Sequence, residues 1–492
     1  MGPRDQFHRL RVGAAGATPV TSVPWPLLFR RRVAGRLEKS PRYGTYVLGV
    51  ALSGMFSVTF TVTILGVAIR DIAAEFDASE SVVSWVITGP ILAFALVGPA
   101  LGRAGDILGH RRVYLWSMSV AAVFALLIAL SWNEWSLISF RVLGAIGGAA
   151  TGPSAMAMIN RVFEPERRVQ AMGYWSMVAA GAPVLGVVFG GPIVDHYNWR
   201  WIFVFQAPLS IVAVLIAALV LPETAREDDI TFDWRGAIAL GAVLGFLLAA
   251  VNRASAWGWS SPAVLVALAG VPTCAMWFWS IEQRSPAPLF PPRYLKLRNV
   301  AAPIGAQATM NFAYMGGFIL TPLLLQNEAA FGFTATRAGM FTIARPLTFS
   351  LMGPLMGWVA LKIGERVNAM IGAVAIVVSM LMLAFGASRR DEMWIIAGLA
   401  LSGFGLGSAG PALSASVANA VDEADFGVAG AAQQMAAQIG VVIGIEVMQS
   451  VQLAAEGSVG VLDSFSRSYL VGAVVASFAF VAAVFVVSTP RE

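Results

Sequence analysis

Residues Ala180 to Pro208 read AGAPVLGVVFGGPIVDHYNWRWIFVFQAP, an apolar segment that runs directly into a second one. Gly186 and Gly190 are four positions apart, so they share one helix face and let two helix backbones approach closely. Prolines inside the segment loosen a helix that the apolar residues would otherwise continue. The cluster Trp199-Arg200-Trp201 separates the two segments and is typical of a membrane–water interface. The stretch therefore predicts two transmembrane helices joined by a short turn at the membrane surface.

The whole chain has the composition of a polytopic membrane protein. It contains 492 residues, of which 57% are hydrophobic and 12% are charged. A soluble protein carries about 25% charged residues. Cys274 is the single cysteine, which excludes a disulfide framework, and the three histidines lie far apart in the sequence. A histidine-based zinc or catalytic site is therefore not expected.

About fourteen stretches are apolar over the roughly 20 residues that a membrane-spanning helix needs. They lie at 44–69, 81–102, 113–131, 135–160, 169–194, 199–221, 235–253, 262–282, 299–325, 335–360, 368–387, 392–418, 427–451 and 467–488. We therefore predict an all-α polytopic membrane protein with 14 transmembrane helices.

The charged loops predict the orientation of the chain in the membrane. Most of the 33 lysine and arginine residues fall on the same side of the predicted spans as the N-terminus. Because positively charged loops stay in the cytoplasm, both termini are expected to be cytoplasmic, in a bacterial-type plasma membrane. Residues 1–43 are basic, and Trp25 to Arg32 place bulky apolar groups beside a run of arginines. This segment either lies on the anionic inner leaflet or forms a disordered tail that obeys the positive-inside rule.

The sequence repeats itself at an offset of about 255 residues. The segment from Gly98 to Gly102 matches Gly353 to Gly357, and Gly186 to Gly190 matches Gly440 to Gly444. These matches relate the second span to the tenth and the fifth to the thirteenth, so two inserted helices separate two six-helix bundles. The predicted domains are a cytoplasmic basic segment at 1–43, a six-helix bundle at 44–222, a linker with two extra helices at 223–298 and a six-helix bundle at 299–492.

The opening stretch resembles a family signature. Pro183, Gly186, Gly190 and Gly191 are similar to the antiporter motif in the fifth helix of major facilitator exporters. The turn that follows resembles the WRW-x-F-x-x-N-x-P pattern of their 14-spanner drug:proton antiporter branch, the EmrB/QacA type, with Gln206 in place of the asparagine. The resemblance implies the major facilitator fold, in which two halves rock around a central path.

A second motif, GRAGDILGHRR from Gly102 to Arg112, lies between the second and third predicted spans. Its glycines allow a tight loop, and its carboxylate can pair with cations or cap a helix N-terminus. It resembles the family's signature loop, which latches the two halves in one access state. By that resemblance Asp106 is the latch with Arg111 and Arg112 as partners, and the gating motif comprises Gly102, Asp106, Gly109, Arg111 and Arg112. The second copy of the motif has Leu361 in place of the aspartate.

Arg141, Arg345 and Glu446 are the candidates for proton coupling, because a charge inside a span is costly. Arg141 resembles an arginine in the family's fourth helix that serves proton transfer; alternatively, backbone carbonyls hold it or it extends outward to the interface. The repeat places Arg345 and Glu446 at similar depths, so the two side chains could pair. Alternatively, Glu446 reaches water at the outer end of its span.

Few polar residues could line a central path. Thr61 stands where the family often has an aspartate in the first helix, and a path that recognises cations usually needs such a carboxylate. This difference favours neutral or lipidic substrates. A polar residue of this kind, taken alone, more often makes a helix–helix hydrogen bond than a ligand contact. The path candidates are Thr61, Thr63, Trp85, Gln307, Asn311, Gln433, Gln434 and Gln438.

The main functional expectation is a proton-coupled exporter of lipophilic compounds that uses alternating access and needs no cofactor besides the proton gradient. The alternative is a transporter or flippase of lipids or lipid-like metabolites with weak or no proton coupling. A membrane enzyme is disfavoured, because no GxSxG or HExxH motif occurs and the GxGxxG match at Gly405 to Gly410 lies inside an apolar span. A sensor or partner subunit that does not transport is a further alternative.

The expected partners are a small lipophilic molecule or lipid substrate and the membrane lipids. No nucleic acid is expected, and the monomer is taken as the working unit.

Overall fold

The computed structural model describes residues 35–37, 39–78, 80–83, 85–224, 233–258, 260–285, 288 and 292–488. These residues form helices and connecting turns, and no β-strand occurs among them. The predicted all-α class is therefore confirmed. The interfacial segment that we predicted from Trp25 to Arg32 lies outside the described residues.

The first bundle packs around two buried apolar clusters. One cluster contains Tyr114 and Met158, and the other, nearer the opposite end, contains Leu65 and Trp199. The helices of this bundle are α2 (Tyr43–Thr59), α3 (Thr61–Glu75), α4 (Glu80–Val83), α5 (Trp85–Leu108), α6 (His110–Ala129), α7 (Glu134–Gly148), α8 (Thr151–Val162), α9 (Pro165–His196) and α10 (Arg200–Val220).

The second bundle has one large core, in which Met310, Met380 and Tyr469 are almost completely buried. Its helices are α14 (Arg298–Gln326), α15 (Ala335–Thr342), α16 (Ala344–Ile363), α17 (Glu365–Arg389), α18 (Glu392–Ala420), the 3-10 turn η1 (Glu423–Asp425), α19 (Phe426–Val459) and α20 (Val461–Val484). Between the bundles the chain forms α11 (Trp234–Trp257), α12 (Pro262–Glu282) and the short α13 (Pro292–Leu295).

Every predicted span coincides with a helix or with two helices in line. Ten runs of described residues are long and apolar enough to cross a membrane by length and composition. The chain is thus a multi-pass membrane protein, while the count of fourteen spans stays a prediction. Several predicted spans are broken in the structure, for example at Phe60 between α2 and α3 and at Ile343 between α15 and α16.

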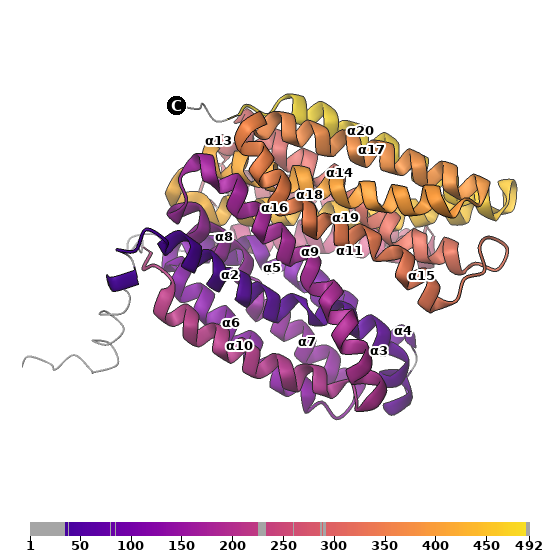
Figure 1. Ribbon diagram of the computed structural model, residues 1–492, viewed down its shortest axis with the longest axis horizontal. Helices are drawn as coiled ribbons and strands as arrows, with labels where there is room; N and C mark the ends of the chain where they lie inside the picture. Colours follow the sequence, from indigo (N-terminus) through magenta and orange to yellow (C-terminus); the bar gives the residue numbers. More distant parts are fainter. Residues whose placement is uncertain are drawn as a thin grey trace, which may run out of the picture.

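The two bundles lie side by side, and their ribbons converge at the end where α8 and α13 lie and diverge toward the end where α3 and α15 lie (Figure 1). Glycines permit the closest crossings. A Cβ atom on Gly173 of α9 would lie 2.5 Å from the Gly353 carbonyl oxygen of α16. A Cβ atom on Gly102 of α5 would lie 2.8 Å from the Gly427 oxygen of α19. Only glycine fits such contacts, which join the second bundle to the first.

The inserted helices α11 and α12 pack against each other at the edge of the two bundles. α11 also contacts α5 of the first bundle and α19 of the second, whereas α12 packs chiefly against α11. Most of the surface of α12 is left uncovered by the other described residues. This arrangement is compatible with the domain boundaries predicted from the internal repeat, which stay a prediction.

The predicted tight loop of the Gly102–Arg112 motif is smaller than expected. Residues up to Leu108 belong to α5 and residues from His110 belong to α6, so Gly109 alone connects the helices. Its φ of 93° is in the region that favours glycine. Gly364, the matching residue of the repeat, has a φ of 89° and alone connects α16 to α17. The repeat is therefore preserved in the backbone of both turns.

Candidate functional site

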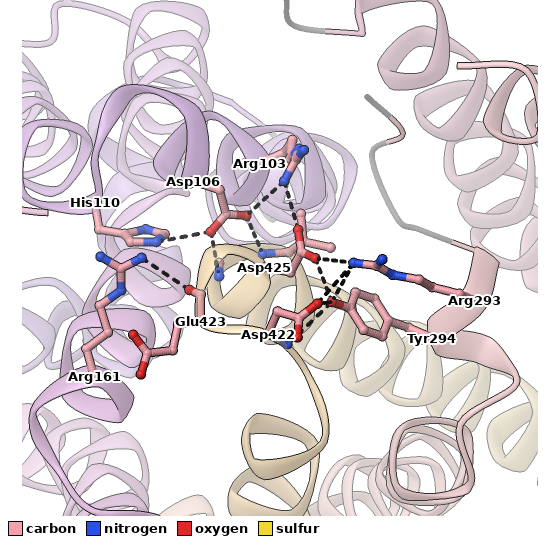
Figure 2. A network of polar contacts seen from close by, with 11 residues as sticks. Arg103, Asp106, His110, Arg161, Arg293, Tyr294, Asp422, Glu423 and Asp425 are labelled. Atoms are coloured by element: carbon pink, nitrogen blue, oxygen red, sulfur yellow. Dashed lines mark hydrogen bonds and ion pairs between the residues drawn. The ribbon is translucent and has the colours of Figure 1, made fainter. Parts of the chain in front are cut away.

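Asp106 lies at the convergent end of the bundles, where α5 meets the first turn of α19 (Figure 2). Its Oδ1 accepts a hydrogen bond of 2.9 Å from the Gly427 amide, and its Oδ2 accepts one of 3.0 Å from the Val428 amide. Free amides and the helix dipole both favour a carboxylate at a helix N-terminus. One buried carboxylate of the first bundle thus caps a helix of the second.

Two side chains of the first bundle, an imidazole and a guanidinium, lie beside this carboxylate. His110 Nε2 lies 3.0 Å from Asp106 Oδ1, and Arg103 Nη1 lies 3.9 Å from Asp106 Oδ2. Arg103 also donates a 3.0 Å hydrogen bond to Asp425 Oδ1, across the boundary between the bundles. All four side chains are at least nine-tenths buried. Such buried ion pairs are sensitive to the loss of either partner.

Two further arginines of the first bundle bind the loop between α18 and α19. Arg168 Nη1 donates to the Ala418 carbonyl at 3.3 Å and to Asn419 Oδ1 at 2.7 Å, and its guanidinium lies 4.9 Å from the centre of the Phe426 ring. Arg161 donates to the Glu423 carbonyl at 3.2 Å. A cation at the end of α18 is favourable because carbonyls there carry partial negative charge.

The linker before α14 contacts the same loop. Tyr294 of α13 donates a 2.6 Å hydrogen bond to Asp425 Oδ2, and its hydroxyl lies 3.0 Å from Asp422 Oδ2. Arg293 Nη2 lies 3.1 Å from Asp422 Oδ2 and 3.3 Å from Asp425 Oδ2. We refer to Arg103, Asp106, His110, Arg161, Arg168, Arg293, Tyr294, Asp422, Glu423 and Asp425 as the convergent-end network.

The partners that we predicted for Asp106 were wrong. Arg111 donates instead to Glu223 Oε1 at 2.9 Å and to the Ala218 carbonyl, which ties α6 to the end of α10. Arg112 is exposed. Asp106 instead contacts Arg103, His110 and the first turn of α19. Arg103 lies three positions before Asp106 and His110 lies four positions after it, so both side chains lie on the same face as Asp106.

The predicted antiporter motif lies on α9, which is helical from Pro165 to His196. Gly186 is buried and Pro183 is half-buried. The surroundings of Gly190 and Gly191 lie outside what the structure describes. Six residues before Pro183, α9 faces α16, where Ser350 Oγ donates to the Met177 carbonyl at 2.9 Å. The motif therefore continues a helix that forms the boundary between the bundles.

The aromatic cluster after α9 is only partly an interfacial feature. Trp201 is 45% exposed, as predicted for a membrane surface, but Trp199 is 1% exposed. Trp199 Nε1 donates to Glu75 Oε2 at 2.7 Å, and Arg200 binds the other oxygen of the same carboxylate. This contact joins α10 to the end of α3 at the divergent end of the first bundle. Gln206 further on donates to the Ser57 carbonyl of α2 at 3.0 Å.

Arg345 is completely buried inside the second bundle. Its Nε donates to Ser402 Oγ and its Nη1 donates to the Tyr314 carbonyl, each at 2.7 Å. The guanidinium also lies 5.1 Å from the centre of the Tyr314 ring. Arg345 thus connects α16 to α14 and α18, and Glu446 is half-buried on α19. The predicted pairing of Arg345 with Glu446 stays a prediction.

Arg141 lies on α7 within the first bundle. Its Nε donates to the Val86 carbonyl at 3.2 Å, and its guanidinium lies 5.9 Å from the centre of the Phe203 ring. This agrees with the alternative in which a backbone carbonyl holds the arginine, and it leaves a role in proton transfer open to test.

Several of the predicted path residues satisfy local hydrogen bonds. Thr61 is buried and donates across the break at Phe60 to the Val58 carbonyl of α2, and Asn311 donates to the Gln307 carbonyl. Gln433 donates to Ser414 Oγ at 2.9 Å. Gln434 faces Met156 across the bundle boundary, with 3.6 Å from its Nε2 to the sulfur. Trp85, Gln307 and Gln438 are half-buried, and the side chain of Thr63 lies outside the described set.

Sequence reasoning missed most of the convergent-end network. Arg103 and His110 belong to the quoted motif but drew no assignment, and Asp422, Glu423 and Asp425 form an acidic loop between two predicted spans. An acidic loop on the basic side of the membrane was the available signal. No group of three metal-binding side chains occurs among the described residues.

Two related helical bundles that contact each other at one end are typical of secondary membrane transporters. The chain belongs to the Major Facilitator Superfamily, whose family model matches residues 51–231, 234–445 and 308–492. The protein is therefore a membrane transport protein and not an enzyme.

Similar curated proteins carry names that refer to resistance and export. The multidrug resistance protein Stp of Mycobacterium tuberculosis (strain CDC 1551 / Oshkosh) is 27% identical over 400 residues, which cover 81% of this chain and 74% of that protein. The tetracenomycin C resistance and export protein of Streptomyces glaucescens is 29% identical over 411 residues, covering 82% and 74%. The methylenomycin A resistance protein of Bacillus subtilis (strain 168) is 28% identical over 416 residues, covering 83% and 88%.

Solved structures support the fold alone. The human organic anion transporter MFSD10 (TETRAN) superimposes with a TM-score of 0.63 at 18% identity, over 89% of this chain and 100% of that chain. The proton:xylose symporter XylE superimposes with a TM-score of 0.64 at 13% identity, over 89% and 94%.

Proposed function

We propose that the protein is a secondary active exporter of lipophilic compounds, coupled to the proton gradient and working by alternating access. The observation that carries this proposal is the convergent-end network, which joins the bundles at one end through helix-capping side chains. Polar contacts of this kind can break and re-form, as a gate between two access states requires. The names of the similar resistance and export proteins favour export as the direction of transport.

The orientation follows from the positive-inside rule, which puts the basic loops and both termini in the cytoplasm of a bacterial-type plasma membrane. The convergent end is then the cytoplasmic end, and the conformation is one closed to the cytoplasm. We further assign the chain to the 14-spanner EmrB/QacA type, with α11 and α12 as the inserted pair between six-helix halves. The packing of α12 on α11 supports this assignment.

The proposed roles of individual residues follow the same scheme. Asp106, held within Gly102 to Arg112, latches the cytoplasmic gate, and Pro183 to Gly191 allow α9 to move against α16. Glu446 is the proposed proton carrier, with Arg345 and Arg141 as the charges that tune it. The glutamines of α14 and α19 line the substrate path.

The alternative is a transporter of lipids or lipid-like metabolites with weak or no proton coupling. Thr61 favours this alternative, because it stands on the first predicted span where a carboxylate would recognise cationic compounds, and its hydroxyl donates to the Val58 carbonyl at the end of α2. Neutral, lipophilic substrates are expected under both proposals.

Transport by the purified protein in proteoliposomes, measured with and without a pH difference across the membrane, distinguishes the proton-coupled exporter from the lipid transporter. A lipophilic dye that moves only with the pH difference supports the exporter. Movement of a labelled lipid between leaflets that is indifferent to pH supports the alternative. Protein-free liposomes and the Asp106→Asn variant provide the controls, and no movement of either probe would contradict both proposals.

A further inference from the structure

The helix α13 lies in the linker between the inserted helix pair and the second bundle, yet it contacts the convergent-end network directly (Figure 2). Tyr294 of α13 is 3% exposed. Its hydroxyl group is 2.6 Å from Asp425 Oδ2 and 3.0 Å from Asp422 Oδ2. A segment outside both bundles is therefore anchored at the point where the bundles meet.

Asp425 accepts from donors in two different parts of the chain, the first bundle and the linker helix α13. Its Oδ1 accepts from Arg103 of the first bundle at 3.0 Å, and its Oδ2 accepts from Tyr294 at 2.6 Å. Arg293 Nη2 also lies 3.3 Å from Oδ2, so Tyr294 is the closest donor to that oxygen, and rotation of the carboxylate would weaken the contacts with Arg103 and Tyr294 together. Tyr294 consequently fixes the orientation in which Asp425 receives Arg103.

The hydroxyl of Tyr294 is a stable donor. Burial, together with the hydrogen bond to the Asp425 carboxylate, raises the pKa of Tyr294 to about 12. The phenol therefore keeps its proton at any physiological pH. Arg293 adds an exposed contact, with 3.1 Å between its Nη2 and Asp422 Oδ2, and exposed ion pairs contribute little.

We propose that α13 is a third component of the gate, a strap that binds the closing contacts, and that Tyr294 is a positioning residue that acts through Asp425. Closure of the gate then requires that the first bundle, the second bundle and the strap contact one another at the same time. The inference rests on the proposed gate at this end.

Gate closure can be measured without any substrate. A Cβ atom on Gly430 would lie 3.8 Å from Met156 Cβ, the separation found in disulfides. In a Cys274→Ser background, the pair Met156→Cys and Gly430→Cys should therefore cross-link rapidly when the gate is closed. The cross-linking rate in membranes, without substrate or pH difference, reports the closed population.

Tyr294→Phe should slow cross-linking about tenfold, the effect expected for loss of a hydrogen bond to a charged group. Tyr46→Phe is the matched control and should not change the rate, because Tyr46 is 40% exposed on α2. Thermal melting of each variant shows whether the fold is intact. Arg103→Gln gives a second test, since it removes the charged donor that Asp425 receives from the first bundle and should slow cross-linking as well.

A double-mutant cycle tests whether Tyr294 acts through Asp425. Adding Tyr294→Phe to Asp425→Asn should cause little further slowing, and a full additional tenfold loss would overturn the positioning role. A normal rate for Tyr294→Phe alongside a slow Asp106→Asn would overturn the strap while leaving the gate. Normal rates for both variants would contradict the proposed gate itself.

Discussion

Asp106 uses both carboxylate oxygens across the boundary between the bundles, so its replacement should act on closure more than on folding. Asp106→Asn leaves one oxygen and introduces an amide that cannot accept from the Val428 or Gly427 amide. Hydrogen bonds to charged groups contribute about 1.5–3 kcal/mol. We expect the closed population to fall about tenfold or more relative to the open one, and dye export from proteoliposomes to fall with it.

The matched control is Asp463→Asn, which changes an exposed aspartate in the first turn of α20. That variant should export at the wild-type rate. Wild-type export by Asp106→Asn, at equal protein and intact thermal stability, would remove Asp106 from the gate.

Glu446 is the residue on which the proposed proton coupling depends. Glu446→Gln keeps the size of the side chain but can no longer gain or release a proton. We expect export to lose its dependence on the pH difference while substrate binding stays measurable. Arg345→Ala should shift the pH dependence, and its thermal stability must be recorded because Arg345 also holds Ser402 and Tyr314.

Dye export measured across a series of pH differences decides the role of Glu446. An unchanged pH profile in Glu446→Gln would make this glutamate structural and would favour the lipid transporter. Glu328→Gln is the control, since Glu328 lies in the turn after α14 outside the bundle core.

At the scale of single residues, the sequence singled out Asp106 but not its partners. The Gly102–Arg112 motif predicted a carboxylate at a helix end, because this feature depends only on residues that are close together in the sequence. The amides of Gly427 and Val428 lie more than 300 positions away, a separation that no local pattern encodes. Trp199 shows the same limit, since its indole is buried by Glu75 rather than placed at the interface.

Helices, as elements, were predicted well because a hydrophobic run of about 20 residues has few alternatives in a membrane. Their breaks were not predicted. The apolar sequence continues through Phe60 and Ile343, so hydropathy cannot show where α3 departs from α2 or α16 from α15. These breaks depend on packing against neighbouring helices, which is a tertiary effect.

The inserted pair α11 and α12 should be removable as an element. Replacing residues 235–282 with a short polar bridge removes two helices and so preserves the orientation of the second bundle. Because α12 packs chiefly on α11, we expect the two bundles to fold and associate. The variant should retain a cooperative thermal transition.

Cysteine accessibility in the second bundle provides the measurement for this excision. The same residues should be labelled from the same side of the membrane as in the full chain. A reversed or mixed labelling pattern would contradict the arrangement of six, two and six helices.

For the whole molecule, the repeat predicted two related bundles, and the paired turns at Gly109 and Gly364 agree with it. The conformational state could not be predicted. Both access states bury the same apolar faces within each bundle, and they differ in which bundle ends are in contact. The polar contacts that decide this, such as Arg103 with Asp425, form only in the folded molecule.

The orientation of the whole molecule in the membrane gives the last prediction. Trp132, in the turn between α6 and α7 at the divergent end, is 71% exposed, and Glu166, at the start of α9 near the convergent end, is also exposed. In a Cys274→Ser background, a membrane-impermeant maleimide should label Trp132→Cys in intact cells. It should label Glu166→Cys only after the membrane is permeabilised, because the basic loops keep that end in the cytoplasm. The reverse pattern would place the closed gate outside and would contradict the proposed orientation, since a substrate in the cytoplasm would then meet the open end of the same conformation.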